Sequence, residues 1–137
     1  MARMNLYLDV DGVILGEGGR PAQHLDEFLD FVLPRFNCFW LTTHQTGVFD
    51  YLRQHLDPAT MQRVQGIQPT TFCTLKAEVL AGDFYWLDDA PLACEIEWLQ
   101  QRGLLDRWIE VNTRRRPDDL LRAVEFLLTN GTDRHDG

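Results

Sequence analysis

Four short apolar segments, each running into polar or acidic residues, constrain the fold of this 137-residue chain more than any other feature. They are residues 5–11, 38–41, 84–87 and 108–111. Each has the length of a strand and is almost continuously apolar, which is typical of strands buried on both faces of a parallel sheet. The segments between them carry apolar residues at helical spacing. We therefore predict an α/β, three-layer, Rossmann-like domain with a central, mainly parallel sheet and helices on both faces.

Helices are predicted between and after these strands. Pro21 opens the first, Thr46 caps the second, and Pro91 starts a later helix that Gly103 can end. The last predicted helix follows residue 117 and carries apolar residues at helical spacing, Leu121, Val124 and Leu128. We expect residues 1–129 to form a single domain and residues 130–137 to form a flexible C-terminal tail.

Composition narrows the class of protein. The net charge of −8 disfavours strong non-specific binding to nucleic acid, because an acidic surface repels phosphate backbones. No stretch approaches the roughly 18 apolar residues of a membrane span, and the first residues do not resemble a signal peptide. Cys38, Cys73 and Cys94 are scattered and form no CxxC pair, so we expect reduced thiols. These features predict a cytoplasmic protein without a membrane partner.

Polar residues that could carry chemistry follow three of the four strands. They are Asp9 and Asp11 after the first strand, Thr42 and Thr43 after the second, and Asp88 and Asp89 after the third. Ligands of parallel sheets bind beyond the carboxyl ends of the strands. Two carboxylates about 4 Å apart repel by roughly 4 kcal/mol at an effective dielectric near 20, so a cluster of four needs a cation. Oxygen donors with little nitrogen or sulfur nearby favour Mg²⁺.

Each of these residues also has a simpler interpretation when it is taken alone. A single aspartate at a strand end is usually a helix cap or a solvated turn residue, and Asp88 with Asp89 could cap the helix after Pro91. Lys76 is the only lysine beside twelve arginines, which an arginine-biased composition would also produce. The functional interpretation therefore depends on the residues occurring together and in one order.

That order resembles the four signature motifs of the haloacid dehalogenase (HAD)-like superfamily. The motifs are an apolar strand running into DVDGV at residues 9–13, Leu41-Thr42, the single Lys76, and a strand ending in WLDD at residues 86–89. The first and last motifs are the most specific, while the threonine and the lysine gain their weight from their position between them. The resemblance covers nearly the whole chain, from Leu6 to about Leu128.

The resemblance implies a Mg²⁺-dependent phosphomonoester hydrolase, a phosphatase that acts through an aspartyl-phosphate. Asp9 would be the nucleophile, and Asp11 would be the general acid and then the general base. Magnesium would be held by Asp9, Asp88 and Asp89 and by the backbone carbonyl of Asp11. The acid at residue 11 favours phosphate hydrolysis over dehalogenation, because branches with other chemistries usually lack it.

A second set of residues is expected to contact the phosphorylated substrate. Thr42 would hydrogen-bond the phosphoryl oxygens, and Lys76 would supply fixed positive charge to the transferring group. The expected phosphate-binding residues are Gly12, Thr42, Thr43, His44 and Lys76. Thr42 is preferred to Thr43 because it directly follows the apolar strand, and His44 could instead be an ordinary loop histidine.

Superfamily members often carry an inserted cap domain, for which residues 12–36 and 43–75 leave too little chain here. We therefore expect a small, capless member with an open site. An open site suits a phosphate on a macromolecule, such as an RNA or DNA end, or needs a partner to close it. The sequence does not indicate which substrate is bound or which oligomeric state the chain adopts.

Two alternative functions remain compatible with the same residues. One is a non-catalytic module of the same fold that binds a phosphorylated ligand or has a regulatory role. The other is a phosphotransferase that uses the same aspartate with an acceptor other than water. Three consecutive arginines also allow two interpretations, a site for a second phosphate or a solvated basic turn. They are Arg114, Arg115 and Arg116.

Overall fold

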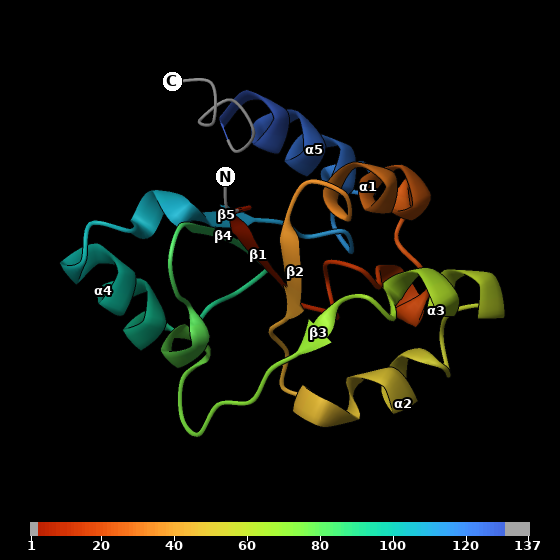
Figure 1. The fold of residues 1–137 in the computed structure, drawn as a ribbon, viewed down its shortest axis with the longest axis horizontal. Helices are drawn as coiled ribbons and strands as arrows, with labels where there is room; N and C mark the ends of the chain where they lie inside the picture. Colours follow the sequence, from red (N-terminus) through yellow and green to blue (C-terminus); the bar gives the residue numbers. More distant parts are fainter. Residues whose placement is uncertain (1–2, 131–137) are drawn as a thin grey trace.

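A computed structural model describes residues 3–130 of the chain as a five-stranded parallel sheet with helices around it (Figure 1). The strand order is β3-β2-β1-β4-β5, and every neighbouring pair is parallel. The strands are β1 (Asn5–Leu8), β2 (Asn37–Trp40), β3 (Gln68–Pro69), β4 (Phe84–Asp88) and β5 (Trp108–Glu110). The predicted α/β class and the parallel sheet are confirmed.

The strands divide their side chains between two separate cores. Because successive side chains of a strand point to opposite faces, Leu6 and Leu8 of β1 enter one core and Tyr7 enters the other. Strand β4 behaves in the same way, with Leu87 in the first core and Trp86 in the second. All five side chains are at most 3% exposed, so both faces of the central strands are covered.

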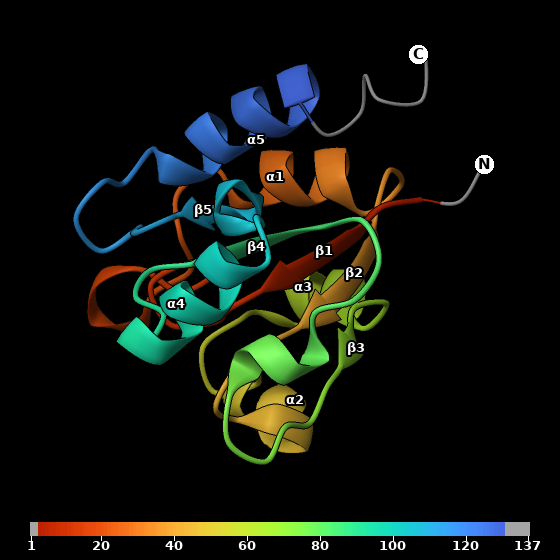
Figure 2. The same ribbon diagram turned by 90° about the vertical axis from the view of Figure 1, so that its left-hand side faces the viewer.

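The helices are shared unequally between these two faces. The first core receives side chains from α1 (Leu25–Val32), α2 (Val48–Leu52), α3 (Pro58–Val64) and α5 (Asp119–Asn130). The second core is covered by α4 (Ala93–Gln101) and by the 3-10 helix η3 (Lys76–Val79). Figure 2 shows α1 and α5 side by side on one side of the sheet and α4 on the other. The helices therefore pack on the two faces of the sheet, and α2 also reaches its carboxyl edge through Tyr51.

Several local predictions were wrong. Helix α1 begins at Leu25 and not at Pro21, because His24 has a positive φ of 65° and Pro21 instead forms a bridge with Leu15. Thr46 does not cap α2, which is preceded by the 3-10 helix η2 (Gln45–Gly47) without a side-chain cap. In α5 the buried apolar residues are Leu120, Ala123 and Leu127, whereas Leu128 is 53% exposed.

The two chain segments in which a cap domain was considered belong to the main body. The first contains a loop with the 3-10 helix η1 (Glu17–Gly19), and we refer to residues 12–20 as the flap. The second contains α2, α3 and β3, and its Val48 and Val64 lie in the first core. Within residues 3–130, no helix combines the length and apolar character needed to cross a membrane. The predicted tail lies outside the described residues, apart from Asn130, which ends α5.

Candidate active site at the carboxyl ends of the strands

Neighbouring strands bring the predicted residues to one edge of the sheet. In the register of β1, Leu8 lies opposite Trp40 of β2 and Leu87 of β4. Asp9 follows Leu8 directly, and its backbone N–H donates to the carbonyl oxygen of Leu87 at 3.0 Å. Asp9 therefore lies beside Asp88, the last residue of β4. The chain moves from β1 to β2 on one side and to β4 on the other, so this edge is where the strand order reverses.

Three charged side chains form an inner cluster at this edge, namely Asp9, Lys76 and Asp88. The Lys76 ammonium nitrogen lies 2.8 Å from Asp88 Oδ2 and 3.5 Å from Asp9 Oδ2. Both aspartates are buried, with exposures of 7% and 1%. Asp9 Oδ1 also accepts from the Val10 backbone N–H at 2.8 Å, and Asp88 Oδ1 accepts from Ala90 at 2.9 Å. Each carboxylate is thus fixed by the backbone on one oxygen and directed toward Lys76 with the other.

Helix capping does not account for Asp88 and Asp89. Helix α4 begins at Ala93, and the residue before it is Leu92, so neither aspartate occupies the capping position. The backbone N–H of Leu92 is instead satisfied by Glu95, whose carboxylate accepts it at 2.9 Å. The simpler interpretation as a cap is therefore excluded.

Lys76 reaches the cluster from η3, which packs on the second core beside α4. Glu78 holds the start of this short helix, because its carboxylate accepts backbone N–H groups of Thr74 and Leu75 at 3.0 and 2.8 Å. Buried Glu95 accepts the Ala77 N–H at 3.3 Å and so connects η3 to α4. These contacts fix the backbone from which the only lysine of the chain extends.

The inner cluster carries more negative charge than Lys76 neutralises. Burial and the charge of Asp88 raise the pKa of Asp9 to about 7, although Lys76 acts in the opposite direction. Burial alone would lower the pKa of Lys76, but Asp9 and Asp88 outweigh it and raise that pKa. Burial and Asp88 also raise the pKa of neighbouring Asp89. A further cation would relieve this repulsion.

The donor set fits a hard divalent cation. One carboxylate oxygen from each of Asp9, Asp88 and Asp89 lies within 4.8 Å of the others. Gly12 explains how the flap approaches so closely, since its φ is +82° and a Cβ there would lie 2.6 Å from Asp89 Oδ2. The Asp11 side chain is not part of this group, and its predicted contribution through the backbone carbonyl stays a prediction.

Four residues form an outer rim above the inner cluster, namely Asp11, His44, Tyr51 and Arg114. The Tyr51 hydroxyl donates to Asp11 Oδ1 at 2.7 Å, and His44 Nε2 lies 3.1 Å from Asp11 Oδ2. The His44 and Tyr51 rings stack with centroids 3.7 Å apart. Partial burial alone would raise the pKa of Asp11, but the hydrogen bonds from Tyr51 and His44 and the charge of Arg114 lower it. Asp11 is therefore held as a carboxylate.

The two threonines after β2 have different surroundings. Thr42 is 1% exposed, and its hydroxyl oxygen accepts the backbone N–H of His44 at 3.2 Å. It lies next to the end of β1, because the N–H of Leu41 donates to the Leu8 carbonyl at 2.8 Å. Thr43 is exposed, and its side chain forms no hydrogen bond within residues 3–130. The preference for Thr42 agrees with this geometry, while the predicted phosphate contacts of both residues stay predictions.

Tyr51 is the residue that the sequence interpretation missed. It lies 40 positions after Asp11, on α2, and donates the shortest hydrogen bond that Asp11 receives. A signal was present in the spacing of His44, Tyr51 and His55, which are seven and four residues apart, a spacing typical of one helical face, although only Tyr51 lies within α2. The Tyr51 and His55 ring centroids are 4.8 Å apart, as expected for such neighbours.

The three consecutive arginines separate into different roles. Arg114 faces the site, with guanidinium nitrogens 4.0 Å from Asp11 Oδ1 and from Asp89 Oδ2. Arg116 turns away and hydrogen-bonds buried Asp119 at 2.9 Å. Arg115 is exposed, and its side chain has no ion pair or hydrogen bond to any residue the structure describes. The three arginines therefore have three different environments, and a phosphate contact stays a prediction.

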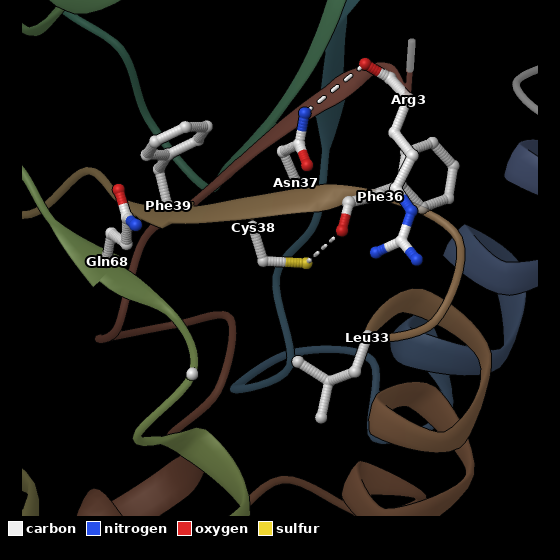
Figure 3. Close-up of a pocket in the computed structure, with 8 residues that line it drawn as sticks. Arg3, Leu33, Phe36, Asn37, Cys38, Phe39 and Gln68 are labelled. Atoms are coloured by element: carbon white, nitrogen blue, oxygen red, sulfur yellow. Dashed lines mark hydrogen bonds between the residues drawn. The ribbon is translucent and has the colours of Figure 1, made fainter. Parts of the chain in front are cut away.

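A separate cavity of about 250 Å³ lies at the opposite edge of the sheet, where β2 begins (Figure 3). Figure 3 shows Arg3, Asn37 and Cys38 around it, with the Cys38 sulfur 3.8 Å from the Phe36 carbonyl oxygen. Burial raises the pKa of the Cys38 thiol to about 12, so the sulfur is an inert thiol and not a nucleophile. This cavity has no carboxylate in its lining, and the carboxyl ends of the strands remain the candidate site.

Comparisons of the chain with protein-family models, with curated proteins and with solved structures returned no match. The function is therefore argued from the geometry of the site.

Proposed function

We propose that this chain is a Mg²⁺-dependent phosphomonoester hydrolase of the HAD-like type, with Asp9 as the nucleophile. The observation that carries the proposal is the inner cluster, in which one ammonium group lies between two buried carboxylates and a third carboxylate completes a cation site. A phosphate dianion can approach such a cluster only when positive charge compensates the carboxylates. Lys76 supplies part of that charge, and a bound cation supplies the rest.

Asp9 suits the role of nucleophile because contacts to both of its carboxylate oxygens fix the orientation of the side chain. Oδ1 is fixed by the Val10 N–H, and Oδ2 faces Lys76. In the first step, a carboxylate oxygen of Asp9 forms a bond to phosphorus while the bond from phosphorus to the ester oxygen breaks. Lys76 and the buried hydroxyl of Thr42 stabilise the negative charge on the transferring group. Bound magnesium, held by Asp9, Asp88 and Asp89, would neutralise phosphoryl oxygens and help to orient the group.

Residues of the outer rim carry out the proton transfers of both steps. In the first step the imidazolium form of His44 gives a proton from Nε2 to the Asp11 carboxylate, 3.1 Å away, and becomes neutral. Asp11 passes this proton to the leaving alkoxide and is a carboxylate again. In the second step, ionised Asp11 removes a proton from water, whose oxygen attacks phosphorus and releases Asp9. The low pKa of Asp11 in the resting site suits this second step directly. Tyr51 holds the carboxylate in place through both steps.

Phosphate release from purified protein, with and without Mg²⁺, tests the proposal. The panel contains p-nitrophenyl phosphate, nucleotides, sugar phosphates and 3′- or 5′-phosphorylated oligonucleotides. We expect magnesium-dependent release that falls by about 10³-fold or more in Asp9→Asn, since removing a nucleophile abolishes covalent catalysis. Asp83→Asn is the matched control, because Asp83 is an exposed aspartate just before β4, away from the site.

The outcomes also separate the alternative functions. Release by Asp9→Asn at the wild-type rate would reject Asp9 as nucleophile. A folded protein that binds phosphorylated compounds without releasing phosphate would indicate a binding module. Transfer of phosphate to an added alcohol in preference to water would indicate a phosphotransferase.

A further inference from the structure

A second pocket adjoins the outer rim, between the flap and the loop that connects β5 to α5. Its volume is about 180 Å³, and its lining includes Glu17 and Arg20 from the flap and Thr113 and Arg114 from the loop. Arg114 is shared between this pocket and the candidate active site, because its guanidinium also lies 4.0 Å from Asp11 and Asp89. A molecule bound in the active site would therefore have this pocket beside it.

The loop that carries Arg114 is held to the start of the flap, just after the catalytic aspartates. The N–H of Thr113 donates to the carbonyl of Gly12 at 2.8 Å, and its hydroxyl donates to the carbonyl of Val13 at 3.2 Å. Asn112 Oδ1 accepts the backbone N–H of Arg114 at 3.2 Å. Arg116 connects the far end of the loop to α5 through Asp119. The backbone of Arg114 is therefore fixed relative to the catalytic aspartates.

The guanidinium of Arg114 is nevertheless available to a ligand. Its side chain is 49% exposed, and both of its ionic contacts are at 4.0 Å, beyond hydrogen-bond length. Arg116, by contrast, makes hydrogen bonds of 2.9 Å to a carboxylate that is 1% exposed. Arg20 is exposed, and within the described residues its side chain has no ion pair or hydrogen bond. Two arginines thus border the pocket with unused donors.

We propose that this pocket binds a second phosphate on the leaving-group side of the substrate, with Arg114 as the main contact and Arg20 as the auxiliary one. The proposal rests on the proposed hydrolase function and names its substrate class, phosphomonoesters that carry another phosphate group. Arginine presents several donors in a planar fork that matches phosphate oxygens. Glu17 opposes this binding by its charge, so it limits the affinity for the second phosphate.

The test is calorimetric binding to the Asp9→Asn protein in the presence of Mg²⁺, which is independent of turnover. The probes are adenosine 5′-monophosphate, adenosine 3′,5′-bisphosphate and a 5′-phosphorylated dinucleotide. We expect at least one of the two probes that carry a second phosphate group to bind about tenfold more tightly than the monophosphate, as one charged hydrogen-bonded contact provides. Preference for the bisphosphate indicates a small metabolite, and preference for the dinucleotide indicates a nucleic-acid end.

Variants of the residues that line the pocket test whether the preference for a second phosphate arises there. Arg114→Gln should remove most of the tenfold preference, Arg20→Gln should remove less, and Glu17→Gln should increase it. Arg115→Gln is the matched control, because it removes one arginine charge from the neighbouring position without touching the pocket. Equal affinities for all three probes, or the same preference in Arg114→Gln as in its parent, would overturn the proposal. Failure of the hydrolase proposal is detected separately, as absence of phosphate release by the wild-type protein.

Discussion

Asp9 and Asp11 are two residues apart after the same strand, yet they lie in opposite electrostatic environments. In the inner cluster, burial and Asp88 raise the pKa of Asp9 to about 7 even though Lys76 is adjacent. In the outer rim, Asp11 is also partly buried, but hydrogen bonds from Tyr51 and His44 and the charge of Arg114 lower its pKa. Identical carboxylates thus acquire different proton affinities from their surroundings. In the resting site the proposed nucleophile has the raised pKa and the proposed acid has the lowered one, which is the reverse of a resting pair of acid and nucleophile.

The two regions also differ in how their charge is balanced. The outer rim contains its own donors, so Asp11 is stable as a carboxylate without a ligand. The inner cluster has two carboxylates beside a single ammonium group, with the carboxylate of Asp89 close to both, and is balanced only when a proton or a cation joins it. Substitutions in the inner cluster should therefore change stability strongly and in a way that depends on bound metal. Substitutions in the outer rim should change stability little and independently of metal.

Removal of Lys76 should have the largest effect. Lys76→Met leaves Asp9 and Asp88 buried without their partner, and such losses destabilise proteins by about 3–5 kcal/mol. Urea unfolding in EDTA measures the change. Arg115→Met, at an exposed arginine whose side chain makes no ion pair or hydrogen bond within residues 3–130, should stay within about 0.5 kcal/mol of wild type. In a double-mutant cycle, Asp9→Asn should recover part of the loss. A loss below about 1 kcal/mol would show that the inner cluster is not strained by its charge.

The pH dependence of stability without metal should reveal the raised pKa of Asp9. A carboxyl with a higher pKa in the folded state binds its proton more tightly there. Its ionisation therefore costs stability progressively between pH 4 and pH 7, and the cost is complete above the folded pKa. We expect Asp9→Asn to raise the melting temperature in EDTA at pH 8 and to change it little at pH 4.

Mg²⁺ should reverse this pattern, because it binds the ionised form and stabilises the folded protein by mass action. The gain in melting temperature with Mg²⁺ should be larger at pH 8 than at pH 5.5 and should shrink in Asp9→Asn. Asp83→Asn, at an exposed site, should reproduce the wild-type profile. A wild-type profile identical to that of Asp9→Asn would contradict the raised pKa.

The close approach of the flap to Asp89 predicts an intermediate effect. Gly12→Ala places a Cβ 2.6 Å from Asp89 Oδ2 and also strains a backbone with φ of +82°. Gly18→Ala shares the strain, with φ of +68°, but meets no atom within 4 Å. Both variants should lose about 1–2 kcal/mol from the left-handed backbone, but only Gly12→Ala should also weaken Mg²⁺ binding. Equal Mg²⁺ affinities in the two variants would show that Asp89 is not a ligand.

The outer rim should give the smallest effect. Tyr51→Phe removes the 2.7 Å hydrogen bond to Asp11, which should cost about 1 kcal/mol or less at this half-exposed position. Because that bond lowers the pKa of Asp11, its loss should shift the acidic limb of the pH–rate profile toward higher pH. Tyr7→Phe is the control, since it removes a comparable bond to the Val79 carbonyl in the second core. It should lower stability and leave the pH–rate profile unchanged.

Much of the fold could be predicted because strands buried on both faces appear in the sequence as short, continuous apolar runs. The segments around Leu6, Phe39, Trp86 and Ile109 were all recognised in this way and form β1, β2, β4 and β5. Strand β3 was missed, since it has only the residues Gln68 and Pro69, and both are exposed. Such a short edge strand exists because β2 offers it backbone partners, which no local pattern reveals.

The inner cluster of the site could be predicted equally well from the sequence. Asp9 and Asp88 directly follow apolar runs, and parallel strands necessarily bring their carboxyl ends to the same edge. Lys76 was identified by its rarity and its order in the chain. The outer rim was only partly predicted, because the position of Tyr51 depends on how α2 packs and Arg114 could not be told apart from its two neighbours.

The sequence by itself determined that the chain forms a parallel α/β sheet and that the aspartates after β1 and β4 gather at one edge, because apolar periodicity and strand direction are local properties. Only the tertiary structure determined the partners and the pKa of each carboxylate. Lys76 contacts Asp9 and Asp88, which lie 67 and 12 positions away in the sequence, and Tyr51 contacts Asp11, which lies 40 positions away. Burial and charge act through space, so the pKa of a group and the partners that set it emerge only when distant segments pack together.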